Sequence, residues 1–282
     1  MKTIKNKKVL AIILSAAVIL VSVLSVLIAI DNKNLQLTEI TVKSEKIPES
    51  FFGYRIAQVS DLHNTELGKD NERLLSMLRD IEPDIIVVTG DLIDSRRTDV
   101  ETGARFLNDA ADIAPCYYVM GNHERRVPAE YERMLELIDN GNVFVLTNEA
   151  VSLERGGEQI TLVGLEDMPE ESTEVSYLVD SLCEDACGYT VLLSHKPDFY
   201  REYADSKADL VFSGHAHGGQ FRLPFIGGLL APGQGLFPEY TEGASEIGDT
   251  VMIVSRGIGN SLFPFRINNR PEVVVASLWG EE

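Results

Sequence analysis

The sequence predicts an α/β fold for most of the chain, preceded by one membrane-spanning helix. Short apolar runs rich in β-branched residues alternate with amphipathic stretches, which is the pattern of buried strands connected by helices. Polar motifs containing Asp, Asn or His follow several of these runs, and a long uncharged stretch lies near the N-terminus. Apart from that stretch, about 250 residues remain, which suits one large domain.

The N-terminal stretch, residues 9–30, contains no charged side chain. Four lysines precede it: Lys2, Lys5, Lys7 and Lys8. A helix needs about 20 apolar residues to cross a membrane, whereas the apolar core of a cleavable signal peptide spans about 7–15 residues and ends in small residues. No clear cleavage site surrounds Ala29, so an uncleaved anchor is favoured over a cleaved signal peptide or a buried core helix. The positive-inside rule then predicts a single-pass protein of the cell membrane, with everything after Asp31 on the extracytoplasmic side.

The chain thus divides into a cytoplasmic basic tail (1–8), a transmembrane anchor (9–30), a tether with a first strand expected in it (31–50) and a large domain (51–282). The net charge of −19 includes the four N-terminal lysines, so the outer part carries −23. Such an acidic domain is repelled by polyanions, and we therefore expect no nucleic-acid partner. A phosphorylated substrate is not excluded, because bound metal ions would be the largest local charges in its site.

The elements follow in order along the chain. An edge strand is expected around residues 35–42, and strands at 143–146, 151–153, 160–163, 251–254 and 273–276. Helices are expected at 70–81, 101–113, 128–140 and 174–184, with a short one at 198–203. Gly156-Gly157 predicts a hairpin, and residues 218–240 are loop-rich.

The three cysteines carry little functional signal. Cys116, Cys183 and Cys187 lack C-x-x-C spacing, so a thiolate metal cluster is not expected. Cys116 opens an apolar run and is interpreted as a small buried hydrophobe. A Cys183–Cys187 bridge is compatible with an extracytoplasmic location and would leave one cysteine over.

All five histidines fall in short polar motifs. Four motifs contain them: Asp61-Leu62-His63, Gly121-Asn122-His123-Glu124, Ser194-His195 and Gly214-His215-Ala216-His217. A fifth motif, Gly90-Asp91, offers a carboxylate. Nearly every motif directly follows a strand-like run, at 56–59, 85–88, 117–120, 191–193 and 210–212. Ligands of open α/β sheets bind outside the carboxyl ends of the strands, so about seven ligands would converge on one crevice. One zinc ion takes roughly four ligands, and seven therefore suit two metal ions sharing a bridge.

This mixture of carboxylate, imidazole and amide oxygen ligands suits Mn²⁺, Fe or Zn²⁺. Two such ions about 3.5–4 Å apart can hold a hydroxide and clamp the oxygens of an in-line phosphoryl displacement. Taken singly, the residues have plainer interpretations: His195 as a core histidine, and Asp61 and Asp91 as helix caps or turn formers. No common packing requirement sets all five motifs in this order, which favours the metal interpretation.

With this ordered set the chain resembles the calcineurin-like metallophosphoesterases, over roughly residues 54–271. The resemblance implies a metal-dependent phosphoesterase with a four-layer αββα sandwich over residues 51–282. The implied ligands are Asp61, His63 and His217 for one metal, Asn122, His195 and His215 for the other, and Asp91 as the bridge. His123 would protonate the leaving oxygen. Asp94 would orient His123 and favour its protonated form, although its spacing equally fits a helix cap.

One position departs from the family pattern. Family protein phosphatases typically carry Arg-Gly directly after the equivalent of Asp94, whereas this chain has Ser95-Arg96-Arg97. Protein phosphatase activity is therefore not expected. The two arginines are interpreted as solvated surface residues, with contact to a phosphate as the alternative.

Three segments resemble the membrane-associated bacterial branch, in which some relatives are assigned as UDP-2,3-diacylglucosamine pyrophosphatases. They are Gly218-Gly219-Gln220, Gly257-Ile258-Gly259-Asn260-Ser261, and Arg266 with Asn268 and Pro271-Glu272. Their glycines would let backbone amides approach a phosphate closely, or would form simple turns. The loop over 218–240 also carries large apolar residues: Phe221, Phe225, Ile226, Leu229, Leu230, Leu236 and Phe237. Such a loop either touches a membrane or an acyl chain, or packs on the core, which is more common.

The sequence therefore predicts a monomeric, membrane-anchored phosphoesterase with two divalent metal ions (Mn²⁺, Fe or Zn²⁺). It would hydrolyse a phosphodiester or pyrophosphate in a small-molecule or lipid substrate, by attack of a metal-bridging hydroxide. The alternatives are a soluble nucleotide or sugar-phosphate phosphodiesterase or phosphatase, a metal-dependent amide hydrolase, and a non-catalytic metal-binding scaffold. Amide hydrolases more typically open with H-x-H, whereas D-x-H comes first here, and degenerate scaffolds usually lose a ligand, whereas none is missing here.

Overall fold

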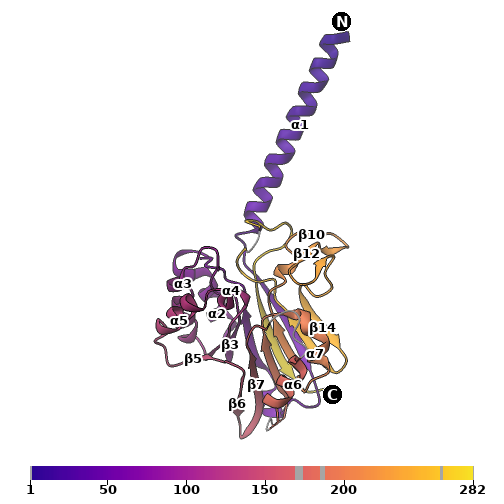
Figure 1. Cartoon of the computed structure of the whole chain (residues 1–282). Coiled ribbons are helices and arrows are strands. Elements are labelled where there is room, and N and C mark those ends of the chain that lie inside the picture. Colours follow the sequence, from indigo (N-terminus) through magenta and orange to yellow (C-terminus); the bar gives the residue numbers. More distant parts are fainter. Residues whose placement is uncertain (1, 169–173, 185–187, 261–262, 282) are drawn as a thin grey trace.

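The computed structural model describes residues 2–168, 174–184, 188–260 and 263–281. Two six-stranded sheets lie face to face, helices cover their outer faces, and one long helix, α1 (Lys2–Asp31), projects from the domain (Figure 1). The prediction of an α/β fold is confirmed.

The first sheet has the strand order β1-β16-β2-β3-β4-β5. Its strands are β1 (Gln36–Lys43), β2 (Tyr54–Val59), β3 (Ile85–Thr89), β4 (Cys116–Val119), β5 (Val143–Val145) and β16 (Glu272–Trp279). Strands β2 to β5 are parallel, so their carboxyl ends meet at one edge of the sheet. Strand β1 lies at the opposite border of the sheet, as predicted, and runs parallel to β16.

The second sheet has the order β14-β15-β9-β8-β7-β6. Its strands are β6 (Glu149–Arg155), β7 (Glu158–Leu165), β8 (Thr190–Ser194), β9 (Leu210–Ser213), β14 (Gly243–Ile247) and β15 (Thr250–Val254). The predicted hairpin joins β6 to β7 through Gly156 and Gly157, which both have positive φ angles. Strand β14 is not predicted by the sequence, because its Gly, Ser and Glu residues give no apolar run.

All five predicted helices are present, although their ends differ from the prediction by a few residues. The helices of the domain are α2 (Glu72–Ile81), α3 (Val100–Ala111), α4 (Asn122–Arg126), α5 (Pro128–Glu136), α6 (Val175–Leu182) and α7 (Tyr200–Ala204), with 3₁₀ turns η1 (Glu49–Phe51), η2 (Lys69–Asn71), η3 (Pro197–Phe199) and η4 (His217–Gly219). The short helix α4 was not predicted. Helix α5 ends before the predicted residue 140 because the Asn108 side chain binds the following backbone: its Nδ2 donates to Leu137 O, and its Oδ1 accepts from Asp139 N.

Three apolar clusters hold these layers together. Leu78 and Phe106 pack α2 and α3 on the outer face of the first sheet. Val87 and Phe212 lie between the two sheets, and Val179 packs α6 on the outer face of the second sheet. The layers therefore follow the order helices, sheet, sheet, helices. Each fully buried side chain of this size contributes about 1.5–3 kcal/mol.

Helix α1 joins the domain through a short connection. The stretch Leu10–Asp31 is long and apolar enough to cross a membrane, and it is not buried by the rest of the structure. Only residues 32–35 separate α1 from β1, so the tether expected over residues 31–50 consists largely of β1 and η1. The first strand of the domain therefore follows the end of α1 closely.

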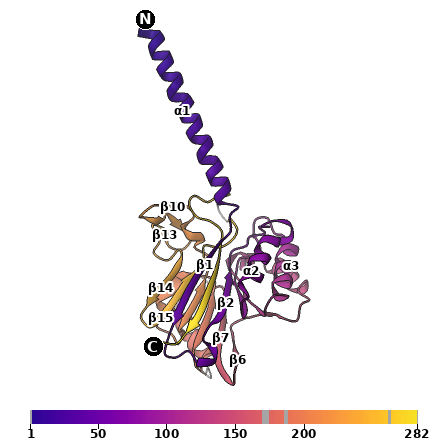
Figure 2. The ribbon, with the colours of Figure 1, turned by 180° about the vertical axis from the view of Figure 1, so that it is seen from behind.

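Residues 218–240 form two small hairpins beside the base of α1, which both views show (Figures 1 and 2). Their strands are β10 (Arg222–Leu223), β11 (Gly227–Gly228), β12 (Leu230–Ala231) and β13 (Gly235–Leu236). The sequence predicts a loop here, and strands of two residues come close to that description.

The described cysteines are free thiols. Cys116 is fully buried in the core next to the first sheet, as predicted, and Cys183 is also buried. Cys187 lies outside the described residues, and so does the expected Cys183–Cys187 bridge.

Candidate metal centre

The structure brings all seven residues that the sequence predicts as metal ligands into one buried crevice. None of them is more than 6% exposed. They are Asp61 and His63 after β2, Asp91 after β3, Asn122 after β4, His195 after β8, and His215 and His217 after β9. The two sheets thus contribute to the crevice from the carboxyl ends of their parallel strands.

A first cluster joins one carboxylate to two imidazoles. His63 Nε2 lies 3.2 Å from His217 Nε2. Asp61 Oδ1 lies 3.5 Å from His217 Nε2 and 3.9 Å from His63 Nε2. The three atoms are close enough to share one cation.

A second cluster surrounds His195 Nε2. This nitrogen lies 3.0 Å from Asn122 Oδ1, 3.1 Å from His215 Nδ1 and 3.2 Å from Asp91 Oδ2. Asp91 Oδ2 also lies 3.6 Å from His63 Nε2 of the first cluster. One carboxylate therefore borders both clusters, which is the position of a bridging ligand.

The hydrogen bonds around the clusters orient the ligands. His195 Nδ1 lies 2.7 Å from Thr89 O, and a proton on Nδ1 leaves the lone pair of Nε2 directed at the second cluster. The Asp61 carboxylate accepts hydrogen bonds from Ser60 Oγ at 2.7 Å and from His215 N at 3.0 Å. Such contacts fix the orientation of Asp61 and His195 before any cation binds.

Burial keeps three imidazoles neutral. It lowers the pKa of His63 to about 3 and the pKa values of His215 and His217 well below their ordinary value. Burial also raises the pKa of Asp61 to about 6. A neutral imidazole offers a lone pair, which is the form that binds a cation.

Asp91 and His195 form an ion pair at the centre of the crevice. Burial alone would raise the pKa of Asp91, but His195 outweighs burial and lowers it well below the ordinary value. Burial alone would lower the pKa of His195, but Asp91 raises it to about 10. A cation in the second cluster would take the position of this proton beside Asp91, since metal ligands bind in their deprotonated forms.

Five of the seven residues have backbone conformations that L-amino acids rarely adopt. Their φ angles are 52° for Asp61, 46° for His63, 54° for Asp91, 64° for His215 and 47° for His217. Such conformations cost on the order of 1–3 kcal/mol each and cluster at functional sites, where the surrounding structure enforces them. Here the backbone bonds from Asp61 N to Gly90 O and from His63 N to Asp91 O, both 3.0 Å, join the two loops.

Glu124 supports the loop that carries Asp91, a role that the sequence did not reveal. This fully buried carboxylate accepts hydrogen bonds from Asp91 N and Gly121 N at 2.9 Å and from Ile93 N at 3.0 Å. Burial raises its pKa to about 7. The only sequence signal was its position inside the Gly121-Asn122-His123-Glu124 motif.

His123 lies beside the clusters, and its ring stands 4.5 Å from the His63 ring. Its Nδ1 accepts a hydrogen bond from Ser95 N at 3.0 Å, which leaves Nε2 as the nitrogen that carries the proton. Asp94 Oδ1 lies 3.6 Å from the same Nδ1, within ion-pair distance when His123 is protonated. Burial lowers the pKa of His123, and the charges of Asp91 and Asp94 act in the opposite direction.

Asp94 is held by Arg96. Arg96 donates to both carboxylate oxygens, from Nε at 3.1 Å and from Nη2 at 3.0 Å. Burial would raise the pKa of Asp94, but these hydrogen bonds outweigh it and lower the pKa. The residue that caps helix α3 is Asp99, so Asp94 is not a helix cap.

Two hollows open next to the clusters. The smaller, of about 250 Å³, is lined by Asp91, His123, Arg96 and Arg126 among others. The larger, of about 650 Å³, is lined by His63, Asn64, Arg96, Arg97, Asn260 and Pro264 among others. Arg96 and Arg97 are exposed as predicted, but they line the crevice, and three guanidinium groups at its mouth favour an anionic ligand.

The glycine-rich segment over residues 257–259 packs against the metal-ligand loop. Gly259 N donates to Asp61 O at 2.7 Å, and a Cβ at Gly257 would lie 2.6 Å from the Asp61 Cβ. These glycines therefore permit a close approach of two backbone segments. Arg266 lies next to this segment, is fully buried and donates to Gly259 O and to Arg256 O.

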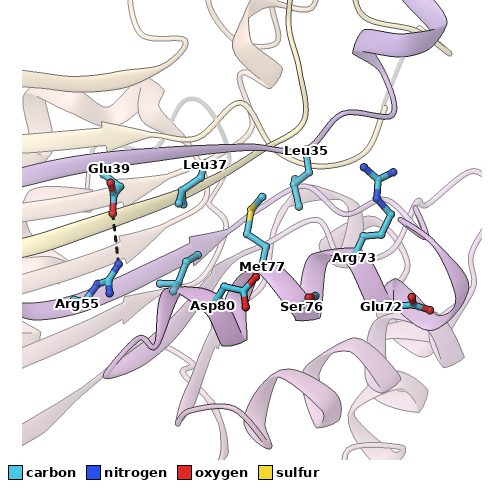
Figure 3. A pocket seen from close by; sticks show the side chains of 10 residues that line it. Leu35, Leu37, Glu39, Arg55, Glu72, Arg73, Ser76, Met77 and Asp80 are labelled. Atoms are coloured by element: carbon cyan, nitrogen blue, oxygen red, sulfur yellow. Dashed lines mark hydrogen bonds and ion pairs between the residues drawn. The ribbon is translucent and has the colours of Figure 1, made fainter.

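A further hollow, of about 590 Å³, lies between β1 and α2 (Figure 3). Leu35, Leu37 and Met77 line it together with the ion pair between Glu39 and Arg55. None of the seven clustered residues lines it, so it is separate from the crevice.

Comparison with known proteins points to one family. Residues 54–219 match the calcineurin-like phosphoesterase family (Metallophos). The uncharacterized metallophosphoesterase YkuE of Bacillus subtilis (strain 168) is 33% identical over 256 residues, which cover 86% of this chain and 85% of YkuE. The phosphodiesterase YaeI of Escherichia coli (strain K12) is 28% identical over 240 residues, which cover 80% of this chain and 82% of YaeI.

Two further proteins bear on the N-terminal helix and the fold. A "transmembrane protein with metallophosphoesterase domain" of Danio rerio is 28% identical over 254 residues, which cover 84% of this chain and 56% of that protein. The crystal structure of TT1561 of Thermus thermophilus superposes with a TM-score of 0.51 at 14% identity, covering 73% of this chain and 90% of TT1561. The likeness to TT1561 concerns the fold alone.

Proposed function

Since the chain belongs to the calcineurin-like phosphoesterase family, we propose that its seven clustered side chains hold the two divalent metal ions that this family uses. The chain is a metal-dependent phosphoesterase, a hydrolase. We assign Asp61, His63 and His217 to one ion and Asn122, His195 and His215 to the other, with Asp91 between them. The position of Asp91 Oδ2 is the main support for this assignment. It lies 3.6 Å from His63 Nε2 of the first set and 3.2 Å from His195 Nε2 of the second.

The ligand set fits Mn²⁺, Fe or Zn²⁺. Two bound cations would supply an activated water molecule and would neutralise charge on the phosphate. The protein's own contribution is to hold the ligand atoms in a buried crevice, from which bulk water is largely excluded.

We assign proton donation to His123. Its Nε2 carries a proton while Nδ1 accepts from Ser95 N, and a protonated ring would direct Nδ1–H at Asp94. A group in this position can pass its proton to the leaving oxygen. Arg96 and Arg126, which line the same hollow, would bind the phosphate oxygens.

The proposed reaction is hydrolysis of a phosphodiester or a pyrophosphate. The test uses the full chain in detergent micelles with Mn²⁺ and compares bis-p-nitrophenyl phosphate, p-nitrophenyl phosphate and a p-nitroanilide. We expect the diester to be hydrolysed fastest and the anilide not at all. Turnover of the anilide would favour the amide hydrolase, and no turnover with two bound ions would favour a non-catalytic scaffold.

We further propose that α1 anchors the enzyme in the cell membrane with residues 31–282 outside, in keeping with the basic tail (1–8), the anchor (9–30), the tether and first strand (31–50) and the catalytic domain (51–282). The length and composition of α1 support a membrane-spanning helix. The lysines before it support the outward orientation of the domain. Protease added to intact cells without a wall should digest the domain and spare a cytoplasmic marker. A protected domain, or a mature chain that begins after Ile30, would contradict the anchored outward orientation.

We also propose that the substrate is lipid-linked. Only residues 32–35 separate α1 from the first strand, so an anchored crevice would remain near the lipid headgroups. The test compares a diacyl pyrophosphate lipid in vesicles with its water-soluble headgroup analogue. We expect a higher kcat/KM for the lipid, whereas equal values would favour a soluble nucleotide or sugar phosphate.

A further inference from the structure

A group of large apolar side chains is exposed on the domain beside α1. Its members are Leu223, Phe225, Ile226, Leu236, Phe237, Phe265 and Ile267, which we call the collar. Phe225 is fully exposed, and Leu236 and Phe237 are 72% and 66% exposed. The expectation that the loop over 218–240 packs on the core is therefore wrong for its tips. Several exposed large apolar side chains in one region of a protein suggest an interaction site.

The two parts of the collar are joined to each other. Phe221 pairs with Ile267 in a β-bridge, and its ring stands 5.5 Å from the Phe265 ring. Arg222 N donates to Ile267 O at 3.0 Å, and Gln220 Nε2 donates to Phe265 O at 2.8 Å. The hairpins and the segment over 263–267 thus form one surface.

The end of α1 is fixed to this same surface. Asn32 Nδ2 donates to Arg266 O at 2.8 Å, and Arg266 N donates back to Asn32 Oδ1 at 2.8 Å. Asp31 and Arg270 add an ion pair at 3.0 Å. These contacts hold the collar beside the last turn of α1, where both views show the hairpins (Figures 1 and 2).

We propose that the collar rests in the interfacial layer of the bilayer that α1 crosses, so that the domain touches the membrane at a second place. The inference rests on the proposed anchoring by α1. A helix that leaves the bilayer at Asp31 brings the residues hydrogen-bonded to Asn32 to the level of the headgroups. Apolar side chains at that level bury about 5–10 Å into the boundary between headgroups and acyl chains.

The chemistry of the collar fits a zwitterionic lipid surface. Its tips are Phe, Leu and Ile, and two neighbouring arginines are paired with carboxylates, Arg222 with Glu242 and Arg270 with Asp31. The domain as a whole is acidic and is repelled by anionic headgroups. Contact with the bilayer therefore depends on apolar burial and does not require anionic lipid.

Membrane contact by the collar would also fix the height of the metal crevice. The hairpins follow directly after η4, which contains His217, and Asn269 Nδ2 donates to His217 O at 2.7 Å and to Gln220 O at 3.2 Å. The segment that holds the end of α1 thus also holds the loop of one metal ligand. The crevice would remain at a constant distance from the headgroups.

The test uses tryptophan fluorescence of the full chain in phosphatidylcholine vesicles whose acyl chains carry bromine, a contact quencher. The only native tryptophan, Trp279, pairs with Lys43 at the end of β1 remote from α1 and is replaced in a Trp279→Phe background. Phe225→Trp and Phe237→Trp report on the collar. Tyr177→Trp, 77% exposed on α6, is the matched control.

We expect the brominated lipid to quench Trp at 225 and 237 several-fold more strongly than Trp at 177, and aqueous iodide to show the reverse order. Equal quenching at all three positions in vesicle-bound protein would overturn the inference. A blue-shifted collar emission that bromine does not quench would also overturn it, in favour of contact between two copies of the chain. A chain that does not float with the vesicles would remove the anchoring on which the inference rests.

The same samples separate this inference from the proposed function. Hydrolysis of bis-p-nitrophenyl phosphate should be unchanged by Phe225→Ser with Phe237→Ser, because neither residue lines the crevice. If the lipid quenches the collar but the protein hydrolyses no phosphoester, the membrane contact stands and the proposed function fails. If hydrolysis is normal and the collar is not quenched, the function stands and the membrane contact fails.

Discussion

The metal centre and the collar are adjacent parts of one molecule, yet they are built in opposite ways. The seven residues that we propose as ligands are nearly or fully buried at the ends of regular strands, and hydrogen bonds from neighbouring residues hold Asp61 and His195. The collar residues are exposed on strands of two residues, and few contacts hold their tips. Catalysis requires atoms at fixed distances, and burial within the protein holds these side chains close together. The apolar collar lacks such burial within the described chain, and we infer that the bilayer supplies it.

The largest effect is expected from Asp91→Asn. It removes the charge that lies between both clusters, so we expect loss of both metal ions and of nearly all turnover. Metal analysis by inductively coupled plasma mass spectrometry and hydrolysis of bis-p-nitrophenyl phosphate measure the two effects. Asp80→Asn, on the exposed face of α2, is the control and should behave as the wild type. Two ions per chain and normal turnover in Asp91→Asn would refute the bridging assignment.

His123→Ala should retain both ions and slow hydrolysis by about 10²–10⁴, the usual contribution of a general acid. The loss should be smaller for nitrophenyl esters, because nitrophenolate leaves without protonation. Rates for alkyl and nitrophenyl esters measure this difference. An equal loss for both ester classes would contradict proton donation by His123.

Core and collar should respond differently to removal of an aromatic ring. Phe212→Ala, in the cluster between the sheets, should lower the free energy of unfolding by about 3–5 kcal/mol. Phe225→Ala should change it by less than about 0.5 kcal/mol, as at other surface positions. Denaturant titration of the full chain in the same detergent measures both values. A large loss for Phe225→Ala would mean that the collar packs within the domain.

A partial loss of metal affinity is expected from Glu124→Gln. The amide offers one acceptor oxygen where the carboxylate offers two, so the three backbone N–H groups around it lose part of their bonding. We expect metal affinity about 10–100-fold weaker, as for other residues that orient metal ligands. Metal titration in a competing chelator measures the affinity. Unchanged affinity would mean that the loop of Asp91 needs no support from Glu124.

The sequence predicted the parts of the fold that depend on local pattern. Apolar runs predicted β2, β3, β4, β8 and β9, and the polar residues after these runs predicted the crevice. The order of those motifs, more than any single histidine, indicated two metal ions. Pattern was sufficient here because parallel strands bring their carboxyl ends together.

The remaining features depend on contacts between distant residues, which no local pattern contains. Glu124 binds the backbone of Asp91 across 33 positions of the chain. Asn108 stops α5 from more than twenty residues upstream. The exposure of Phe225 and Phe237 depends on hairpins that are too short for a periodic signal.

A crystal structure of the full chain grown with Mn²⁺ would locate the bound ions by their anomalous scattering. We expect two peaks about 3.5–4 Å apart, one beside Asp61, His63 and His217 and the other beside Asn122, His195 and His215. Asp91 should contact both ions. A single peak, or two peaks that Asp91 does not join, would contradict the two-metal site.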